Sequence, residues 1–260
     1  GSKDPPFFFS ATWHRMLPTM PALDPLALTG LRTTHVVESP EFATRLHPEV
    51  LRALRALRDA AVSVGIDLAV ASGFRDYARQ RTIWNAKFRG ERAVLDSRGA
   101  PVDLALLDDA GKIEAILQWS ALPGASRHHW GTDIDVYDRA ATPDRSPSLV
   151  SAEYEPGGPY ARLSEWLDEA APSFGFFRPY RSDRGGVRPE AWHLSYAPIA
   201  GPCLEAHSLA VLQLAIESEP IAGQDAVLRE LPTLHRRFVH NIDPLPQTSA
   251  FEFGDHRRVV

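Results

Sequence analysis

Two polar stretches, far apart in the chain, constrain the fold more than any other feature of the sequence. The first reads Ser-Arg-His-His-Trp-Gly-Thr-Asp-Ile-Asp over residues 126–135, and the second reads Glu-Ala-Trp-His over residues 190–193. His128, Asp135 and His193 offer two nitrogen ligands and one oxygen ligand, a set typical of catalytic zinc, which leaves its fourth position to water. A fold that uses these ligands must bring the two stretches together.

The first stretch leads into a predicted strand. Residues 132–137 have the β-branched, alternating pattern of a short strand. Asp133 and Asp135 would then project from the same face. Gly131 would permit a tight turn that returns His128 to the strand.

The second stretch is also predicted to be a strand, entered from a loop. Pro189 precedes Glu-Ala-Trp-His-Leu-Ser-Tyr over residues 190–196. Glu190 would lie close to the metal without being a ligand, as a general base must.

A third stretch completes a pattern shared with known proteins. Residues 72–81 read Ser-Gly-Phe-Arg-Asp-Tyr-Ala-Arg-Gln-Arg, ahead of the two metal-binding stretches. Together, over roughly residues 48–198, the three resemble peptidoglycan carboxypeptidases of the D-alanyl-D-alanine carboxypeptidase (VanY-like) family. That family belongs to a zinc peptidase clan with the D-Ala-D-Ala dipeptidases and a group of phage endolysins.

The resemblance implies a role for each site residue. It implies one zinc ion on His128, Asp135 and His193, with Glu190 as the general base. It places Arg75 in the cleft, where a guanidinium can bind a substrate carboxylate or stabilise charge on the scissile carbonyl oxygen. Further substrate contacts are expected from Ser126, Gln80 and Trp192.

Two neighbours of the predicted ligands leave alternatives open. His129 could replace His128 as a ligand. The family places its histidine seven residues before the aspartate, which favours His128 as the ligand and puts His129 on the rim of the site. Asp133 stands where the family usually carries a small residue, typically alanine. A carboxylate there could support a ligand from behind or could alter the pocket.

The expected function is that of a zinc D-alanyl-D-alanine carboxypeptidase acting on peptidoglycan stem peptides. Alternatives on the same scaffold are an L,D-carboxypeptidase, a D-Ala-D-Ala dipeptidase and an L-Ala-D-Glu endopeptidase. A non-catalytic cell-wall-binding module or a signalling domain is an alternative of another class, because hedgehog-type domains resemble this fold. Glu190 and Arg75, intact beside all three ligands, count against that class.

The order of predicted elements indicates an α+β fold. It is a small antiparallel sheet with flanking helices, as in the D-Ala-D-Ala carboxypeptidase and hedgehog-like zinc peptidase fold. A long surface loop is expected over residues 138–159. Helical patterns cover residues 48–65, 76–88, 112–120 and 160–171, and strand-like segments cover 66–72 and 174–177.

The chain is expected to divide into three parts. Residues 1–40, partly tag-derived, form either an extended arm that packs on the domain through Phe7, Phe8, Phe9 and Trp13 or an irregular tail. Residues 41–200 form the zinc peptidase domain. Residues 201–260 form an extension packed on that domain. In the extension, helices are expected over 204–217 and 226–231, and prolines including Pro232 prevent a long regular unit. His235 and His240 are expected to be surface histidines.

Composition narrows the partners and the compartment. A formal charge of −5 argues against nucleic acid and anionic membranes. No apolar run approaches the roughly 18 residues of a membrane span. A single cysteine, Cys203, excludes a closed cysteine zinc site and any intramolecular disulfide. We expect a periplasmic or cell-envelope location if a leader preceded the chain, and a cytoplasmic one if the native start lies near Met16.

Overall fold

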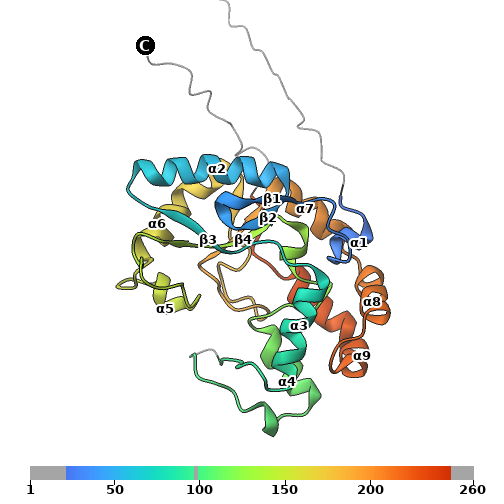
Figure 1. The fold of residues 1–260 in the computed structure, drawn as a ribbon. Coiled ribbons are helices and arrows are strands. Elements are labelled where there is room, and N and C mark those ends of the chain that lie inside the picture. The colour runs from blue at the N-terminus through green and yellow to red at the C-terminus, as the bar shows by residue number, and fades with distance from the viewer. Residues whose placement is uncertain (1–21, 97–98, 247–260) are drawn as a thin grey trace, which may run out of the picture.

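The structure is a computed structural model that describes residues 22–96 and 99–246 (Figure 1). The contacts predicted for Phe7, Phe8, Phe9 and Trp13 lie outside the described residues. Regular structure begins before residue 41, with helix α1 (Pro25–Leu28) and a hairpin of β1 (Val37–Ser39) and β2 (Thr44–Leu46).

A four-stranded antiparallel sheet forms the centre of the molecule. Its order is β3 (Leu68–Ser72), β4 (Asp133–Asp138), β6 (His193–Tyr196) and β5 (Phe176–Phe177). Every neighbouring pair is antiparallel. The α+β prediction with a small antiparallel sheet is confirmed, and both metal-binding stretches contribute a strand.

Helices α2 (Pro48–Ser63) and α6 (Ala161–Ala170) pack on the sheet to make the first core (Figure 1). Leu54 and Leu57 of α2 and Leu163 of α6 are fully buried there. Pro48 occupies the first turn of α2, where its missing N–H has no intrahelical partner to lose. Because these apolar faces repeat at helical spacing, the sequence predicted both helices correctly.

A second core joins the middle of the chain to its C-terminal part. Helix α3 (Tyr77–Phe88) begins after Asp76, the N-cap, whose side chain accepts the Arg79 N–H, and α4 (Asp109–Leu117) packs beside it. The same core includes residues of α8 (Leu209–Ser218) and α9 (Gln224–His235). The extension therefore shares its apolar interior with α3 and α4.

The extension differs from its predicted helices in two ways. The helix expected over 204–217 is two helices, α7 (Ala197–Ala206) and α8, separated at His207, with Ser208 capping α8. Pro232, expected to interrupt regular structure, lies inside α9, which continues into a π-helical turn over Arg236–His240. Tertiary packing of α9 outweighs the lost backbone hydrogen bond.

The segment 138–159 is not simply a surface loop. It contains α5 (Ser151–Tyr154), and the buried Tyr154 hydroxyl donates to the Val136 carbonyl oxygen at 2.8 Å. Glu153 accepts the N–H groups of Ser148 and Leu149 and so closes the loop on itself. The remaining short helical turns cover Pro40–Phe42, Leu104–Leu106, Arg127–Trp130 and Ala171–Phe174.

Across the described ranges, no single helix is long and apolar enough to cross a membrane. The bent pair α7 and α8 passes that test of length and composition only when its two helices are taken together.

Candidate metal centre

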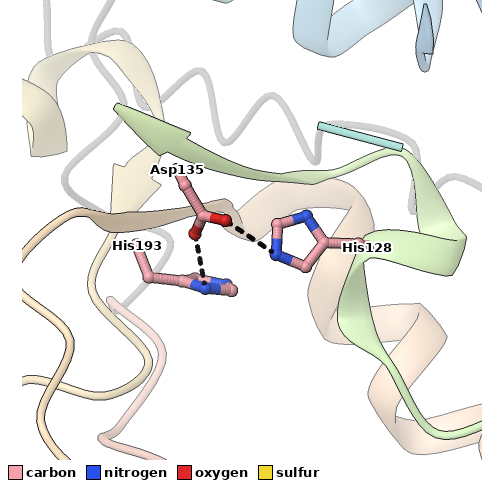
Figure 2. Close-up of side chains that lie close together, drawn as sticks. All are labelled: His128, Asp135 and His193. Carbon is pink, nitrogen blue, oxygen red and sulfur yellow. Dashed lines mark ion pairs between the residues drawn. The ribbon is translucent and has the colours of Figure 1, made fainter. Parts of the chain in front are cut away.

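The register of the sheet brings two of the predicted ligands face to face. Asp135 on β4 pairs directly with His193 on β6, and Asp133 pairs with Ser195 one step along the same face. Side chains directly opposite in an antiparallel pair have Cβ atoms about 5 Å apart. Figure 2 shows the Asp135 carboxylate between the rings of His193 and His128.

The third predicted ligand reaches the site through a tight turn. His128 lies in the 3-10 turn Arg127–Trp130, which ends at Gly131 with a φ of 67°. A Cβ atom at Gly131 would lie 2.4 Å from Val36 Cγ1, so both the left-handed backbone and the close approach require glycine. The predicted role of Gly131 is confirmed.

Hydrogen bonds fix which nitrogen of each imidazole is free. His128 Nδ1 lies 2.8 Å from the Gly73 carbonyl oxygen and must donate to it, which leaves the Nε2 lone pair free. His193 Nε2 lies 2.9 Å from Asp133 Oδ1 and donates to it, which leaves Nδ1 free. Burial lowers the pKa of His128 to about 3, so that ring is neutral, as a metal ligand must be.

The free atoms converge on one point beside Asp135. His128 Nε2 is 3.5 Å from Asp135 Oδ2, and His193 Nδ1 is 3.3 Å from Asp135 Oδ1. The three ligand atoms all lie within 4.8 Å of one another. Asp135 Oδ1 is buried and accepts no hydrogen bond, a costly condition that a cation between the three residues would relieve. The donor set and its orphaned oxygen therefore fit a metal ion.

Glu190 lies next to the ligands on the loop that enters β6. Its Oε2 is 3.2 Å from His193 Nδ1, and its backbone N–H donates to the Tyr180 carbonyl oxygen at 2.9 Å. Burial raises the pKa of Glu190, and the negative charge of Asp135 adds to this, whereas His193 and Arg75 oppose it. A carboxylate with a raised pKa beside a metal site is suited to taking up a proton.

Arg75 faces the same point from the end of β3. One guanidinium nitrogen is 3.6 Å from Asp135 Oδ2, and another donates to Gln80 Oε1 at 3.2 Å. Its Nε is buried without a hydrogen-bond partner. The fully buried Gln80 donates to the Ala121 carbonyl oxygen, so its amide orients Arg75 from behind and does not line the cleft.

Asp133 lies behind His193 in a fully buried polar network. Besides His193 it accepts hydrogen bonds from Arg127 Nε at 2.8 Å and Ser195 Oγ at 3.1 Å. Thr132 Oγ1 donates to the same carboxylate at 2.5 Å. Of the two possibilities left open for this residue, Asp133 therefore supports a ligand from behind and does not line the cleft.

His129 is buried, and its predicted position on the rim is wrong. Its side chain is 0% exposed; Nδ1 donates to the Arg75 carbonyl oxygen at 2.6 Å, and Nε2 accepts the Gly124 N–H at 3.1 Å. Gly30 lies against the His129 ring, where an added Cβ would be 2.4 Å from Nδ1, and His207, at the end of α7, donates to the Gly124 carbonyl oxygen. His129 therefore fixes the backbone that carries Arg75.

The site opens into a cleft of about 600 Å³. Ser126 and Trp192 line it, although Trp192 also packs against Tyr154 in the first core. Sequence reasoning did not single out Tyr180 and Lys87, which also line the cleft. The Tyr180 ring meets the His193 ring edge-on at 5.0 Å, and no sequence signal marks it.

Comparison with known protein families identifies the family of the chain. Residues 43–199, which include every predicted site residue, match the family described as VanY, D-alanyl-D-alanine carboxypeptidase. The chain belongs to this family. As a member of the VanY carboxypeptidase family it is classed among the hydrolases, and the resemblance predicted from its three motifs is confirmed.

Relatives from two bacteria match part of the chain. It is 45% identical over 103 residues to an uncharacterized protein of Haemophilus influenzae, covering 38% of this chain and 70% of that protein. A second such H. influenzae protein is 36% identical over 121 residues, covering 45% and 92%. A D-alanyl-D-alanine carboxypeptidase of Enterococcus faecalis is 30% identical over 163 residues, covering 58% of this chain and 51% of that enzyme.

Solved structures with a similar backbone path include VanYB in complex with D-alanine-D-alanine. It is 24% identical with a TM-score of 0.47, and the match covers 76% of this chain and 91% of that chain. The LdcB LD-carboxypeptidase is 20% identical with a TM-score of 0.47, covering 76% and 78%.

Proposed function

We propose that this VanY-family chain is a zinc-dependent D-alanyl-D-alanine carboxypeptidase that removes the terminal residue of peptidoglycan stem peptides. The observation that carries the proposal is the convergence of two free imidazole nitrogens and an unpaired carboxylate oxygen, with a second carboxylate beside them. Because its substrate belongs to the cell wall, the proposal includes a periplasmic or cell-envelope location.

One zinc ion would be held by His128 Nε2, His193 Nδ1 and Asp135. A zinc ion at three protein ligands acts as a Lewis acid and lowers the pKa of its water to about 7. The Gly73 carbonyl and the Asp133 carboxylate accept the other N–H of each imidazole and so hold both rings in the ligating tautomer.

Glu190 moves the proton in the proposed reaction. Its carboxylate takes a proton from the attacking water and then delivers it to the nitrogen of the departing amino acid. Burial favours the protonated form of Glu190, so the carboxyl group can hold that proton between the two steps. The site needs no second titratable group for this transfer.

Arg75 and the cleft walls orient the peptide. The guanidinium donates to the scissile carbonyl oxygen as negative charge develops there, and Gln80 and the His129–Arg75 backbone contact hold it in place beforehand. Ser126 and Trp192 would contact the bound peptide end from the cleft wall. Preorganised donors of this kind contribute most when water is excluded, as in this buried site.

The test is to incubate the zinc-loaded protein with defined muropeptides that carry pentapeptide, tetrapeptide or cross-linked stems and to identify the products by mass. Release of one D-alanine from the pentapeptide is the expected result. Loss from the tetrapeptide alone would indicate an L,D-carboxypeptidase, release of D-Ala-D-Ala a dipeptidase, and cleavage between L-Ala and D-Glu an endopeptidase. Failure to cleave any stem would refute the proposal in favour of a binding module.

A further inference from the structure

Lys87 is a buried cation that the proposed reaction does not use. It lies on α3, seven residues after Gln80 and so on the same face of the helix two turns later. Its side chain lines the cleft together with Arg75, Glu190 and the three ligands, yet the residue is only 8% exposed. Lysine is rarely this buried unless it is paired.

The polar surroundings of Lys87 leave its charge uncompensated. Its ammonium donates to Ser120 Oγ at 2.7 Å, and among the described residues no carboxylate forms an ion pair with it. Burial and the charges of Arg92 and Arg75 lower the pKa of Lys87 to about 8, against the opposing effect of Glu190. An ammonium with three donors and one neutral acceptor has capacity left for an anion.

The cleft carries charges of both signs. Asp135, Glu190 and Arg75 lie at the metal-binding point, and Lys87 and the exposed Arg92 add positive charge from α3 and the segment after it. Arg92, like Lys87, forms no ion pair with any described residue. A peptide bound with its scissile carbonyl at Arg75 would therefore meet a cationic wall on this side of the cleft.

We propose that Lys87, with Ser120 and Arg92, forms a subsite that binds a carboxylate of the substrate. The inference rests on the proposed function, because it concerns the same cleft. The ammonium and the Ser120 hydroxyl can both donate to one carboxylate, and charge-assisted bonds of this kind are about twice as strong as neutral ones. The carboxylate is either the free C-terminus of the peptide or a side-chain carboxylate within it.

The test measures peptide binding without turnover, in the zinc-loaded Glu190→Gln protein. Calorimetry compares a stem pentapeptide with the same peptide amidated at its C-terminus and with one amidated at its side-chain carboxylate. The peptide with both carboxylates free is expected to bind at least about tenfold more tightly than one of the two amides. Adding Lys87→Met, which keeps an unbranched side chain but removes the ammonium, is expected to remove that difference, and Lys87→Arg to restore part of it.

The matched control is Lys112→Met on α4, a lysine that does not line the cleft and pairs with Asp109. It is expected to preserve the preference for the free acid. The amide that binds more weakly than the free acid identifies which carboxylate is bound. The inference is overturned if Lys87→Met keeps the full preference, if it weakens all three peptides equally, or if the starting protein does not distinguish them. If Lys87→Met removes the preference but the wild-type protein hydrolyses no stem peptide, the proposed function is contradicted and the subsite stands.

Discussion

At the scale of single residues, His193 is the best-determined group in the site. Its Nε2 is fixed by Asp133, and its Nδ1 faces oxygens of Asp135 and Glu190 at 3.3 and 3.2 Å. Burial by itself lowers the pKa of His193, but the nearby carboxylates of Asp133, Asp135 and Glu190 raise it well above the ordinary value. So much negative charge around one imidazole favours a cation at this point, either a proton on the ring or a metal ion beside it.

Replacing Asp133 with asparagine tests the support behind this ligand. The amide keeps the size of the side chain but removes the charge that makes His193 a stronger ligand, and changes of this kind weaken metal binding by about 10–100-fold. We therefore expect a zinc dissociation constant raised by about that factor in chelator competition. Asp138→Asn, at the far end of the same strand, is the control. Wild-type zinc affinity in Asp133→Asn would contradict the role assigned to this carboxylate.

At the scale of elements, the C-terminal helices and the central helices stabilise one another. Besides the shared apolar core, the Tyr77 hydroxyl donates to the Glu219 carbonyl oxygen at 2.7 Å, and the Trp84 indole donates to the Ala222 carbonyl oxygen at 2.9 Å. Arg237 forms two bonds of 2.7 Å with Glu114 on α4. Helix α3, which carries Gln80 and Lys87, is therefore held in place by the C-terminal part of the chain.

The Leu231→Ala substitution tests whether this extension unfolds with the domain. Leu231 is 2% exposed, and truncating a buried leucine costs about 2–5 kcal/mol. We expect one cooperative urea transition, shifted as a whole to lower denaturant and followed by tryptophan fluorescence and circular dichroism. Leu214→Ala, at a leucine that is 66% exposed, should change stability by less than about 0.5 kcal/mol. A separate early transition in Leu231→Ala, with the main transition unmoved, would mean that the extension folds independently.

The junction of α7 and α8 makes stability depend on pH. Burial lowers the pKa of His207 to about 4, whereas the unfolded chain has a histidine pKa of about 6.5. Between these values the unfolded state binds a proton that the folded state does not, so this residue's contribution is present above pH 6.5 and is lost as the pH falls toward 4.

His207→Gln should therefore reduce the pH dependence of unfolding. Glutamine can still donate to the Gly124 carbonyl oxygen but cannot be protonated. In urea unfolding of the metal-free protein between pH 6 and 5, we expect its slope of stability against pH to be lower by up to about 1.4 kcal/mol per pH unit. Equal slopes in the two proteins would show that His207 does not couple folding to protonation.

At the scale of the whole molecule, the sequence predicted what depends on local pattern. The strand of Asp135, the turn at Gly131 and the helix capped by Asp76 follow from residue spacing and backbone preference, and the structure contains all three. The cluster of His128, Asp135 and His193 could be predicted because few residue types bind zinc and their spacing is characteristic.

What the sequence did not predict depends on contacts between distant segments. His129 is buried against Gly30 and Gly124, and His235 is buried against His207. Pro232 stays helical because Leu231 and Leu234 beside it are buried in the second core. Lys87 is buried by Ser120 and the segment that follows α4. The burial and the partners of such residues can be predicted only when the segments that contact them have been placed.

The most direct test of the central claim is the zinc content and turnover of Glu190→Gln, measured side by side. If Glu190 is the base and not a ligand, the variant should bind one zinc ion per chain with the affinity of the wild type. It should also release D-alanine from a pentapeptide stem at least about 100-fold more slowly, within the usual contribution of a positioned base. Substantial residual turnover would contradict Glu190 as the base, and loss of zinc would contradict the assignment of the ligands to His128, Asp135 and His193 alone.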